Sequence, residues 1–292
     1  MDFLSISDLD GATLEALALR SITLAAQWQD RSMAQTLHGA RIGWIEELPG
    51  WRNPTALALG ALSMGATCVR VEARLNGAEP VADLAGYMDN WFDLLGIRTP
   101  SLAQLQRFAD HADAAVLNLR TQDDHPCEIL GDLAYVLAHR GAWDGLRVAM
   151  VGPAGNIAQS WLEAAQVLPI HVAHVCLPQH AFPKDAYHGR ATLSLNLADA
   201  ETADVIVTDC WPGDMAPDEN AQLLRLQISA ACLDRCRPGV VFLPCPPVTR
   251  GQEVSDDAMR HGSCAAARAK AYLLHVQNAV MERALGRHPS DG

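Results

Sequence analysis

The chain has 292 residues, of which 49% are hydrophobic and 19% are charged, a composition typical of a folded globular protein. Its formal net charge of −12 disfavours nucleic acid as a partner, because phosphate binding needs clustered Lys and Arg. No apolar run approaches the roughly 18 residues that span a bilayer, and the acidic N-terminus does not resemble a signal peptide. We therefore expect a cytoplasmic protein with no membrane partner.

Helix-like and strand-like segments alternate over residues 1–140. A helix is expected at 8–29, with Ser7-Asp8 as its N-cap. Further strands are expected at 40–47, 67–72, 94–99 and 114–119, and further helices at 55–64, 80–93, 102–112 and 125–140. Alternation of this kind predicts a parallel sheet in a doubly wound α/β fold.

The pattern breaks at 141–145, and a second alternating series follows. Strands are expected at 146–152, 170–177, 203–211 and 240–246, with a helix at 156–167 and a further apolar segment at 227–236. A last helix at 264–286 is expected to pack back on the first domain. The sequence thus predicts two doubly wound parallel-sheet α/β domains, at 1–140 and 145–263, linked by long helices.

Cysteine spacing and glycine spacing point to neither a metal nor a nucleotide cofactor. Cys232 and Cys236 are one helical turn apart, but no second pair or nearby His completes a zinc set, and reduced thiols are expected for all eight cysteines. The segment 151–161 carries G-x-x-G, not G-x-G-x-x-G, and the next strand lacks the acidic residue that holds a ribose. No cofactor is expected.

Polar residues stand at the ends of several expected strands. Arg52, Arg98 and His125 do so in the first domain, and Asp209 and Cys245 in the second. Each has an ordinary alternative role, as a helix-terminal surface residue, a helix cap or a core thiol. Ligands of open α/β sheets bind beyond the carboxyl ends of the strands, so these residues could converge on one cleft.

Read in order, several motifs resemble those of the aspartate/ornithine carbamoyltransferase family, and most closely its ornithine branch. The segment GWRNPT (50–55) is in register with the family's Ser-Thr-Arg-Thr-Arg motif, and HPCEILGD (125–132) is similar to His-Pro-x-Gln-x-Leu-x-Asp. TDCW (208–211) and PCPPVTRGQEV (244–254) are similar to Thr-Asp-x-Trp and to His-Cys-Leu-Pro with its Arg-Gly-x-Glu-Val tail. The resemblance covers nearly the whole chain.

The resemblance implies a homotrimer, with active sites near subunit boundaries, that transfers a carbamoyl group from carbamoyl phosphate to an amine. Its small-molecule substrates would be a phosphorylated donor and an amino acid or amine. It implies catalytic roles for Arg98, His125 and Cys245, the last beside the reacting amine. It implies substrate-binding roles for Trp51, Arg52, Asn53, Thr99, Glu128, Asn156, Asp209 and Asp214.

The chain also departs from the family pattern. Gly50, Trp51, Asn53 and Pro54 replace three hydroxyl residues and the second Arg of the phosphate motif. Glu128 replaces the Gln expected to hold the carbamoyl amide, which puts an anion beside a dianionic ligand. The segment 212–220 contains no Arg, which disfavours aspartate as the acceptor.

Three interpretations therefore remain open. The first is a divergent carbamoyltransferase acting on an ornithine-like amine. The second keeps the cleft but changes the reaction or the donor, with Glu128 binding a cationic group or accepting a proton. The third is a catalytically inactive paralogue that binds a metabolite.

Overall fold

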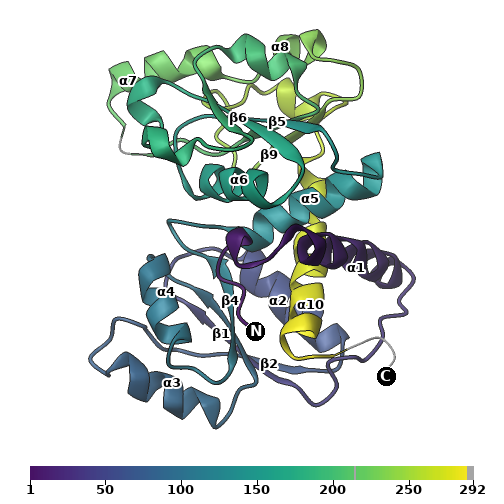
Figure 1. Ribbon diagram of the computed structural model, residues 1–292, viewed down its shortest axis with the longest axis vertical. Helices are drawn as coiled ribbons and strands as arrows, with labels where there is room; N and C mark the ends of the chain where they lie inside the picture. The colour runs from purple at the N-terminus through teal and green to yellow at the C-terminus, as the bar shows by residue number, and fades with distance from the viewer. Residues whose placement is uncertain (214, 288–292) are drawn as a thin grey trace. The chain divides into compact units, whose positions relative to one another are not determined.

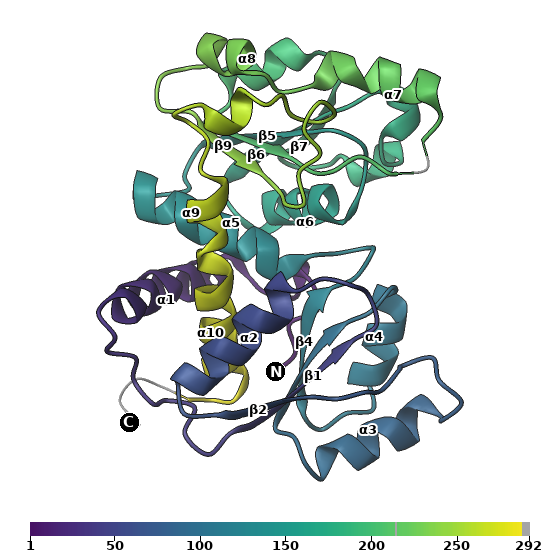
Figure 2. The same ribbon diagram turned by 180° about the vertical axis from the view of Figure 1, so that it is seen from behind.

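A computed structural model describes residues 1–213 and 215–287, and the chain forms two compact units. Unit 1 contains Met1–Gly141 and the chain from Lys270 onward, and unit 2 contains Ala142–Ala269. Figures 1 and 2 show the elements of each unit from opposite sides. Within the described ranges, no helix is long and apolar enough to cross a membrane.

Unit 1 is built on a four-stranded parallel sheet. Its strands are β1 (Arg41–Glu46), β2 (Thr67–Arg70), β3 (Leu94–Arg98) and β4 (Ala115–Arg120), in the order β2-β1-β3-β4. Every residue of β3 is buried. A continuous apolar run of this kind is typical of a parallel strand covered on both faces.

Helices cover both faces of this sheet. They are α1 (Gly11–Gln29), α2 (Arg52–Ser63), α3 (Val81–Asp89), α4 (Leu102–Ala109), α5 (Pro126–Arg140) and α10 (Tyr272–Ala284). Residues of α3 and α4 pack with Ile45 and Leu95 on one face. On the other face α2 lies so close that a Cβ on Gly96 would be 2.6 Å from Leu57. Helix α10 packs against α1, α2 and α5, as both views show (Figures 1 and 2).

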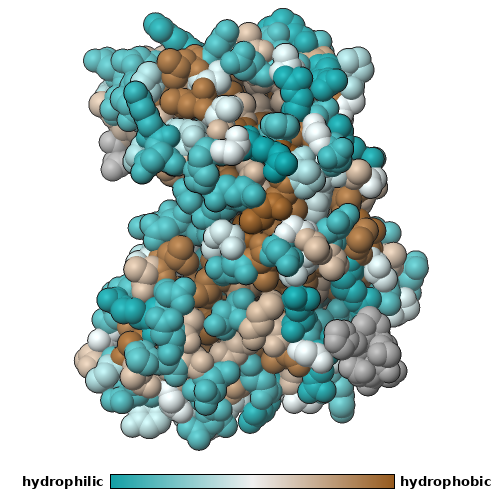
Figure 3. Space-filling model, in the orientation of Figure 1, coloured by the Kyte–Doolittle hydropathy of each residue, from teal (hydrophilic) through white to brown (hydrophobic). Residues whose placement is uncertain are grey.

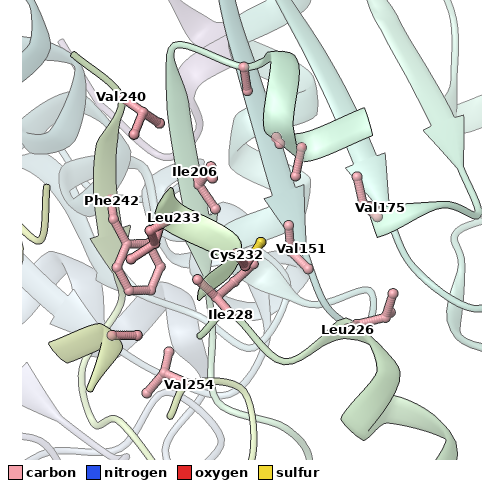
Figure 4. Packing of buried hydrophobic residues seen from close by; sticks show 14 of the residues in the cluster. Val151, Val175, Ile206, Leu226, Ile228, Cys232, Leu233, Val240, Phe242 and Val254 are labelled. Atoms are coloured by element: carbon pink, nitrogen blue, oxygen red, sulfur yellow. The ribbon is translucent and has the colours of Figure 1, made fainter. Parts of the chain in front are cut away.

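Unit 2 is built on a five-stranded parallel sheet. Its strands are β5 (Leu146–Val151), β6 (Ile170–Val175), β7 (Ala191–Ser194), β8 (Val205–Thr208) and β9 (Val241–Pro244), in the order β7-β6-β5-β8-β9. Its helices are α6 (Asn156–Val167), α7 (Pro217–Leu223) and α8 (Ala230–Arg235), and α9 (Ala266–Lys270) leads back to unit 1. Figure 4 shows Ile206 and Phe242 of the sheet packed with Leu233 of α8.

The sheets agree with the alternation expected from the sequence, but several details differ. The helix expected at 264–286, for example, is divided into α9 and α10. The N-cap of α1 is Asp10, whose Oδ1 accepts a hydrogen bond from Thr13 N at 2.7 Å, while Asp8 belongs to a separate turn that begins at Ser5. Helix α2 begins at Arg52, three residues earlier than expected, because a proline in the first turn needs no intrahelical N–H partner. Strand β7 and helix α7 have weak local patterns and were not expected.

The surface mixes polar and apolar side chains. On the face shown in Figure 3, hydrophilic and hydrophobic residues alternate over short distances. Large apolar side chains are exposed at several positions, and the most exposed is Trp51, which keeps 69% of its surface open. An exposed indole directly before a helix is uncommon enough to mark the β1–α2 loop for closer inspection.

Candidate functional site

Arg98, at the end of β3, holds the loop between β1 and α2. Its Nε donates to the carbonyl oxygen of Leu48 at 3.0 Å, and its Nη2 donates to that of Pro49 at 2.8 Å. Burial lowers the pKa of Arg98 to about 10, and the charge of Arg120 acts in the same direction. The side chain therefore remains a cation at neutral pH. The same guanidinium holds the loop in place and contributes a positive charge to this region.

Glu47 joins the same loop to two neighbouring segments. Its Oε2 accepts a short hydrogen bond from the Thr99 hydroxyl, and its Oε1 accepts one from Leu75 N at 2.7 Å. Its backbone N–H donates to Arg98 O at 2.8 Å. Glu47 thus anchors Leu75, in the connection between β2 and α3, and sequence reasoning missed this contact.

The first turn of α2 presents one cation outward and one amide inward. The Arg52 guanidinium lies 5.2 Å from the ring centroid of Trp51, at the surface. Asn53 is buried, and its Oδ1 accepts a hydrogen bond from Gln277 Nε2 of α10 at 2.9 Å. In the part of the chain that the structure describes, no side chain caps this helix. Its first N–H groups and Arg52 therefore favour an anion.

His125 stands directly before α5 and is 6% exposed. Burial lowers its pKa to about 3, with Arg120, Arg98 and Lys270 acting in the same direction and Glu128 opposing them. The imidazole is therefore neutral at physiological pH. A neutral ring keeps one N–H donor, which suits an oxygen that gains negative charge during a reaction.

Glu128 of α5, expected to stand as an anion beside the ligand, is neutralised by Lys270. The ammonium of Lys270 lies 2.6 Å from Glu128 Oε1 and 2.8 Å from Asp132 Oδ1. Burial raises the pKa of Asp132, and the lysine opposes that shift. Sequence reasoning missed Lys270, although it is one of only two lysines in the chain.

In unit 2, three of the expected residues follow neighbouring strands. Asn156 begins α6 after β5, Asp209 follows β8, and Cys245 follows β9. The backbone N–H of Cys245 donates to Thr208 O at 2.8 Å. This bond extends the hydrogen bonding between β8 and β9 as far as Cys245. Asp214, the remaining expected residue, lies outside the described residues.

A second carboxylate, that of Glu253, lies within electrostatic range of Asp209. Glu253 is 1% exposed, and its Oε1 accepts a hydrogen bond from Thr249 N at 2.5 Å. Burial raises the pKa of Glu253, and the charge of Asp209 adds to that shift. Two neighbouring acidic groups favour a cationic ligand over an anionic one at this end of the sheet.

A buried histidine supports the turn that leads to Asn156. His174 Nε2 lies 2.8 Å from Gly152 O, and Nδ1 lies 2.8 Å from the Tyr187 hydroxyl. Because a carbonyl oxygen can only accept, Nε2 carries the proton and Nδ1 accepts from the tyrosine. The tyrosine oxygen in turn accepts from Phe182 N at 3.1 Å. Sequence reasoning did not single out this network.

A groove with a volume of about 820 Å³ borders the β1–α2 loop. Three exposed apolar side chains line it, those of Trp51, Leu59 and Leu62. Of the residues expected at the site in unit 1, only Trp51 belongs to its lining. The groove therefore lies beside the cations of unit 1 and is a separate surface.

The chain has two parallel-sheet α/β units, each with polar side chains at the carboxyl ends of its strands. This architecture defines a class of two-domain α/β proteins that bind small molecules at the strand ends. Residues 1–138 match the domain described as "Aspartate/ornithine carbamoyltransferase, carbamoyl-P binding domain", and residues 144–284 match "Aspartate/ornithine carbamoyltransferase, Asp/Orn binding domain". The chain belongs to the aspartate/ornithine carbamoyltransferase family, which confirms the resemblance seen in the motifs.

Individual relatives agree with this assignment. The chain is 29% identical to the ornithine carbamoyltransferase of Chlorobaculum tepidum, over 96% of this chain and 88% of that protein. Among solved structures, ornithine carbamoyltransferase from Pyrococcus furiosus has a TM-score of 0.92 at 21% identity, covering 98% of this chain and 97% of the other. The enzyme from Burkholderia thailandensis has a TM-score of 0.90 at 25% identity, covering 97% and 98%. The fold and the ornithine branch are thereby confirmed.

Proposed function

We propose that this chain transfers a carbamoyl group from carbamoyl phosphate to an ornithine-like amine. The observation that carries the proposal is the fixed cation of Arg98, which holds the loop that leads into the uncapped first turn of α2. Together with Arg52, that turn offers positive charge and backbone N–H groups, which are what a phosphate group needs. The match to a carbamoyl-P binding domain over residues 1–138 supports this assignment.

In the proposed reaction the amine nitrogen attacks the carbonyl carbon of the donor. A C–N bond forms, the C–O bond to phosphate breaks, and phosphate leaves with the bonding electrons and takes up the proton that the amine loses. The carbonyl oxygen gains negative charge as the nitrogen approaches. Arg98 and His125 are the proposed partners of that oxygen, one as a cation and one as a neutral donor.

The acceptor is proposed to be a cationic amino acid or amine bound by unit 2. Asp209, reinforced by the charge of Glu253, would receive an ammonium group, and Asn156 would hydrogen-bond the polar end of the acceptor. Cys245 would lie beside the reacting amine. Asp214 is proposed to contact the acceptor as well, and the lack of Arg over 212–220 argues against aspartate as the acceptor.

An activity assay tests this proposal directly. The protein is incubated with carbamoyl phosphate and a panel of amines that includes ornithine and its N-acylated forms, and released phosphate and ureido product are measured. Arg98→Met should reduce turnover at least about 100-fold, in line with the loss of a charged group at a developing oxyanion. Arg107→Gln, at an exposed site on α4, is the matched control and should leave turnover unchanged.

Glu128 favours a second candidate, in which the fold is kept and the donor is changed. A carboxylate at this position could also hold an amidine or another cationic group. Under this alternative the wild-type protein releases no phosphate with any amine, and it turns over a donor that carries a cationic group. Under the third interpretation, an inactive metabolite-binding protein, ornithine would bind in a calorimetric titration while every donor remained unreacted.

We also propose that the protein is a cytoplasmic homotrimer. The groove lined by Trp51, Leu59 and Leu62 leaves apolar surface next to the proposed donor site, as expected of an interface with a second copy. Light scattering after size-exclusion chromatography should give three times the chain mass. Leu62→Glu should dissociate the assembly, whereas Leu19→Glu, at a similarly exposed site on α1, should not. A wild-type monomer would refute the trimer.

A further inference from the structure

A single, largely buried lysine side chain bridges two carboxylates of α5. Lys270 is the last residue of α9, and its ammonium contacts Glu128 and Asp132, which are one helical turn apart. The three side chains are 12%, 5% and 1% exposed, respectively. Charges buried this deeply persist only when they are paired, so the lysine and the carboxylates depend on one another.

The position of the lysine is set by a close approach of the chain to α5. A Cβ on Gly131 would lie 3.4 Å from the backbone nitrogen of Leu273, which is van der Waals contact, so α5 lies directly against the backbone at the start of α10. This packing puts the ammonium between its partners. The contact with Glu128 is therefore a product of helix packing, and a flexible surface lysine would not reproduce it.

The two carboxylates are not equivalent. Glu128 lies in the first turn of α5, three residues after His125, and its charge acts on both His125 and Arg98. Asp132 lies one turn farther into the helix. Because electrostatic interaction falls with distance, an unpaired Glu128 would oppose an anion near Arg98 more strongly than an unpaired Asp132 would.

We propose that Lys270 is a specificity-determining residue that neutralises and orients the Glu128 carboxylate, so that a phosphorylated donor can bind beside an acidic side chain. This rests on the proposed function, because it assumes that a phosphate group binds near Arg98. Glu128 then accepts a hydrogen bond from an N–H of the donor. The site selects donors that present an amino group to Glu128 and rejects those that present only oxygen acceptors.

The test uses the full-length protein and two probes, inorganic phosphate and carbamoyl phosphate, with affinities measured by calorimetry and unfolding followed in parallel. Lys270→Met should weaken binding of both probes by about 10-fold or more, because it removes the ammonium that pairs with the Glu128 carboxylate. Lys270→Met with Glu128→Gln should restore phosphate affinity to within about three-fold, by the same argument. Lys270→Met with Asp132→Asn is the matched control, and it should recover stability without recovering affinity.

Equal recovery of affinity in the two double variants would overturn the proposal, as would an unchanged affinity in Lys270→Met. If Lys270→Met does not fold, the single variants Glu128→Gln and Asp132→Asn test the proposal instead. Glu128→Gln should bind phosphate more tightly than wild type, because the lysine charge is then less compensated, and Asp132→Asn should change affinity less. Equal effects would refute the specific role of Glu128. A wild-type protein that binds neither probe would instead refute the proposed function, and this inference with it.

Discussion

Gly50 and Arg98 are in contact, and the contact leaves no room for a side chain on the glycine. A Cβ built on Gly50 would lie 2.6 Å from Arg98 Nη2 and 2.7 Å from its Cζ. The guanidinium thus lies against the loop backbone while donating to the carbonyl oxygens of Leu48 and Pro49. Glycine replaces a hydroxyl residue of the family motif here, so this departure is linked to the position of Arg98.

Gly50→Ser, which restores the residue type of the family motif, should displace the Arg98 guanidinium and open the loop. We expect kcat/KM for carbamoyl phosphate to fall at least about 10-fold, because a small misplacement of a catalytic cation is costly. Steady-state kinetics check this expectation. Gly86→Ala is the matched control, since nothing lies within 4 Å of a Cβ there. A Gly50→Ser variant with higher activity than wild type would show that the loop tolerates the family residue.

Asn53→Ala should destabilise unit 1. The change removes the acceptor of Gln277 Nε2 at a site with no solvent access, and an unsatisfied buried amide costs about 1–3 kcal/mol. Chemical denaturation measures the free energy of unfolding. Gln106→Ala, which removes an exposed hydrogen bond to Asp110, should cost no more than about 0.5 kcal/mol. Similar losses in both variants would contradict a buried structural role for Asn53.

The pKa of His125 is lowered to about 3, from an ordinary value of 6.5, chiefly by burial. The unfolded state therefore binds one more proton than the folded state between these two values. Stability contributed by the neutral ring is present above pH 6.5 and is lost as the pH falls toward 3, by up to about 1.4 kcal/mol per pH unit. Burial gives His275 a pKa of about 4, which adds a second term of the same sign.

Unfolding measured from pH 7 to pH 4.5 checks this dependence. His125→Gln should flatten the decline of stability with falling pH, and His275→Gln should flatten it to a smaller extent. His111→Gln, at an exposed position of the same unit, is the control variant. An identical slope in wild type and His125→Gln would show that the ring is not buried as a neutral group.

Asp209→Asn should impair the acceptor and spare the donor. Loss of the carboxylate removes the partner of the proposed ammonium group, and charge-assisted bonds are worth about 1.5–3 kcal/mol, so KM for the amine should rise by at least about 10-fold. Phosphate affinity, measured by calorimetry, should stay unchanged because the donor residues belong to unit 1. A larger effect on phosphate than on the amine would contradict the assignment of roles to the two units.

Local sequence patterns were enough to predict the two parallel-sheet domains and the polar residues at the strand ends. Strand and helix periodicity is local, and a helix such as α6 can be delimited at 156–167 from its own residues. The order of the motifs also determined the family. The short elements β7 and α7 were not predicted, because so few residues carry too little periodic signal.

Which side chains contact one another became clear only from the folded chain. The pairs Arg98–Gly50, Asn53–Gln277 and Lys270–Glu128 join segments far apart in the chain, and no local pattern encodes them. One signal was present: carboxylates at 128 and 132 share a face of a predicted apolar helix and need a cation, and the chain has only two lysines. Which lysine supplies it depends on how the last helices pack, and packing is a property of the folded chain as a whole.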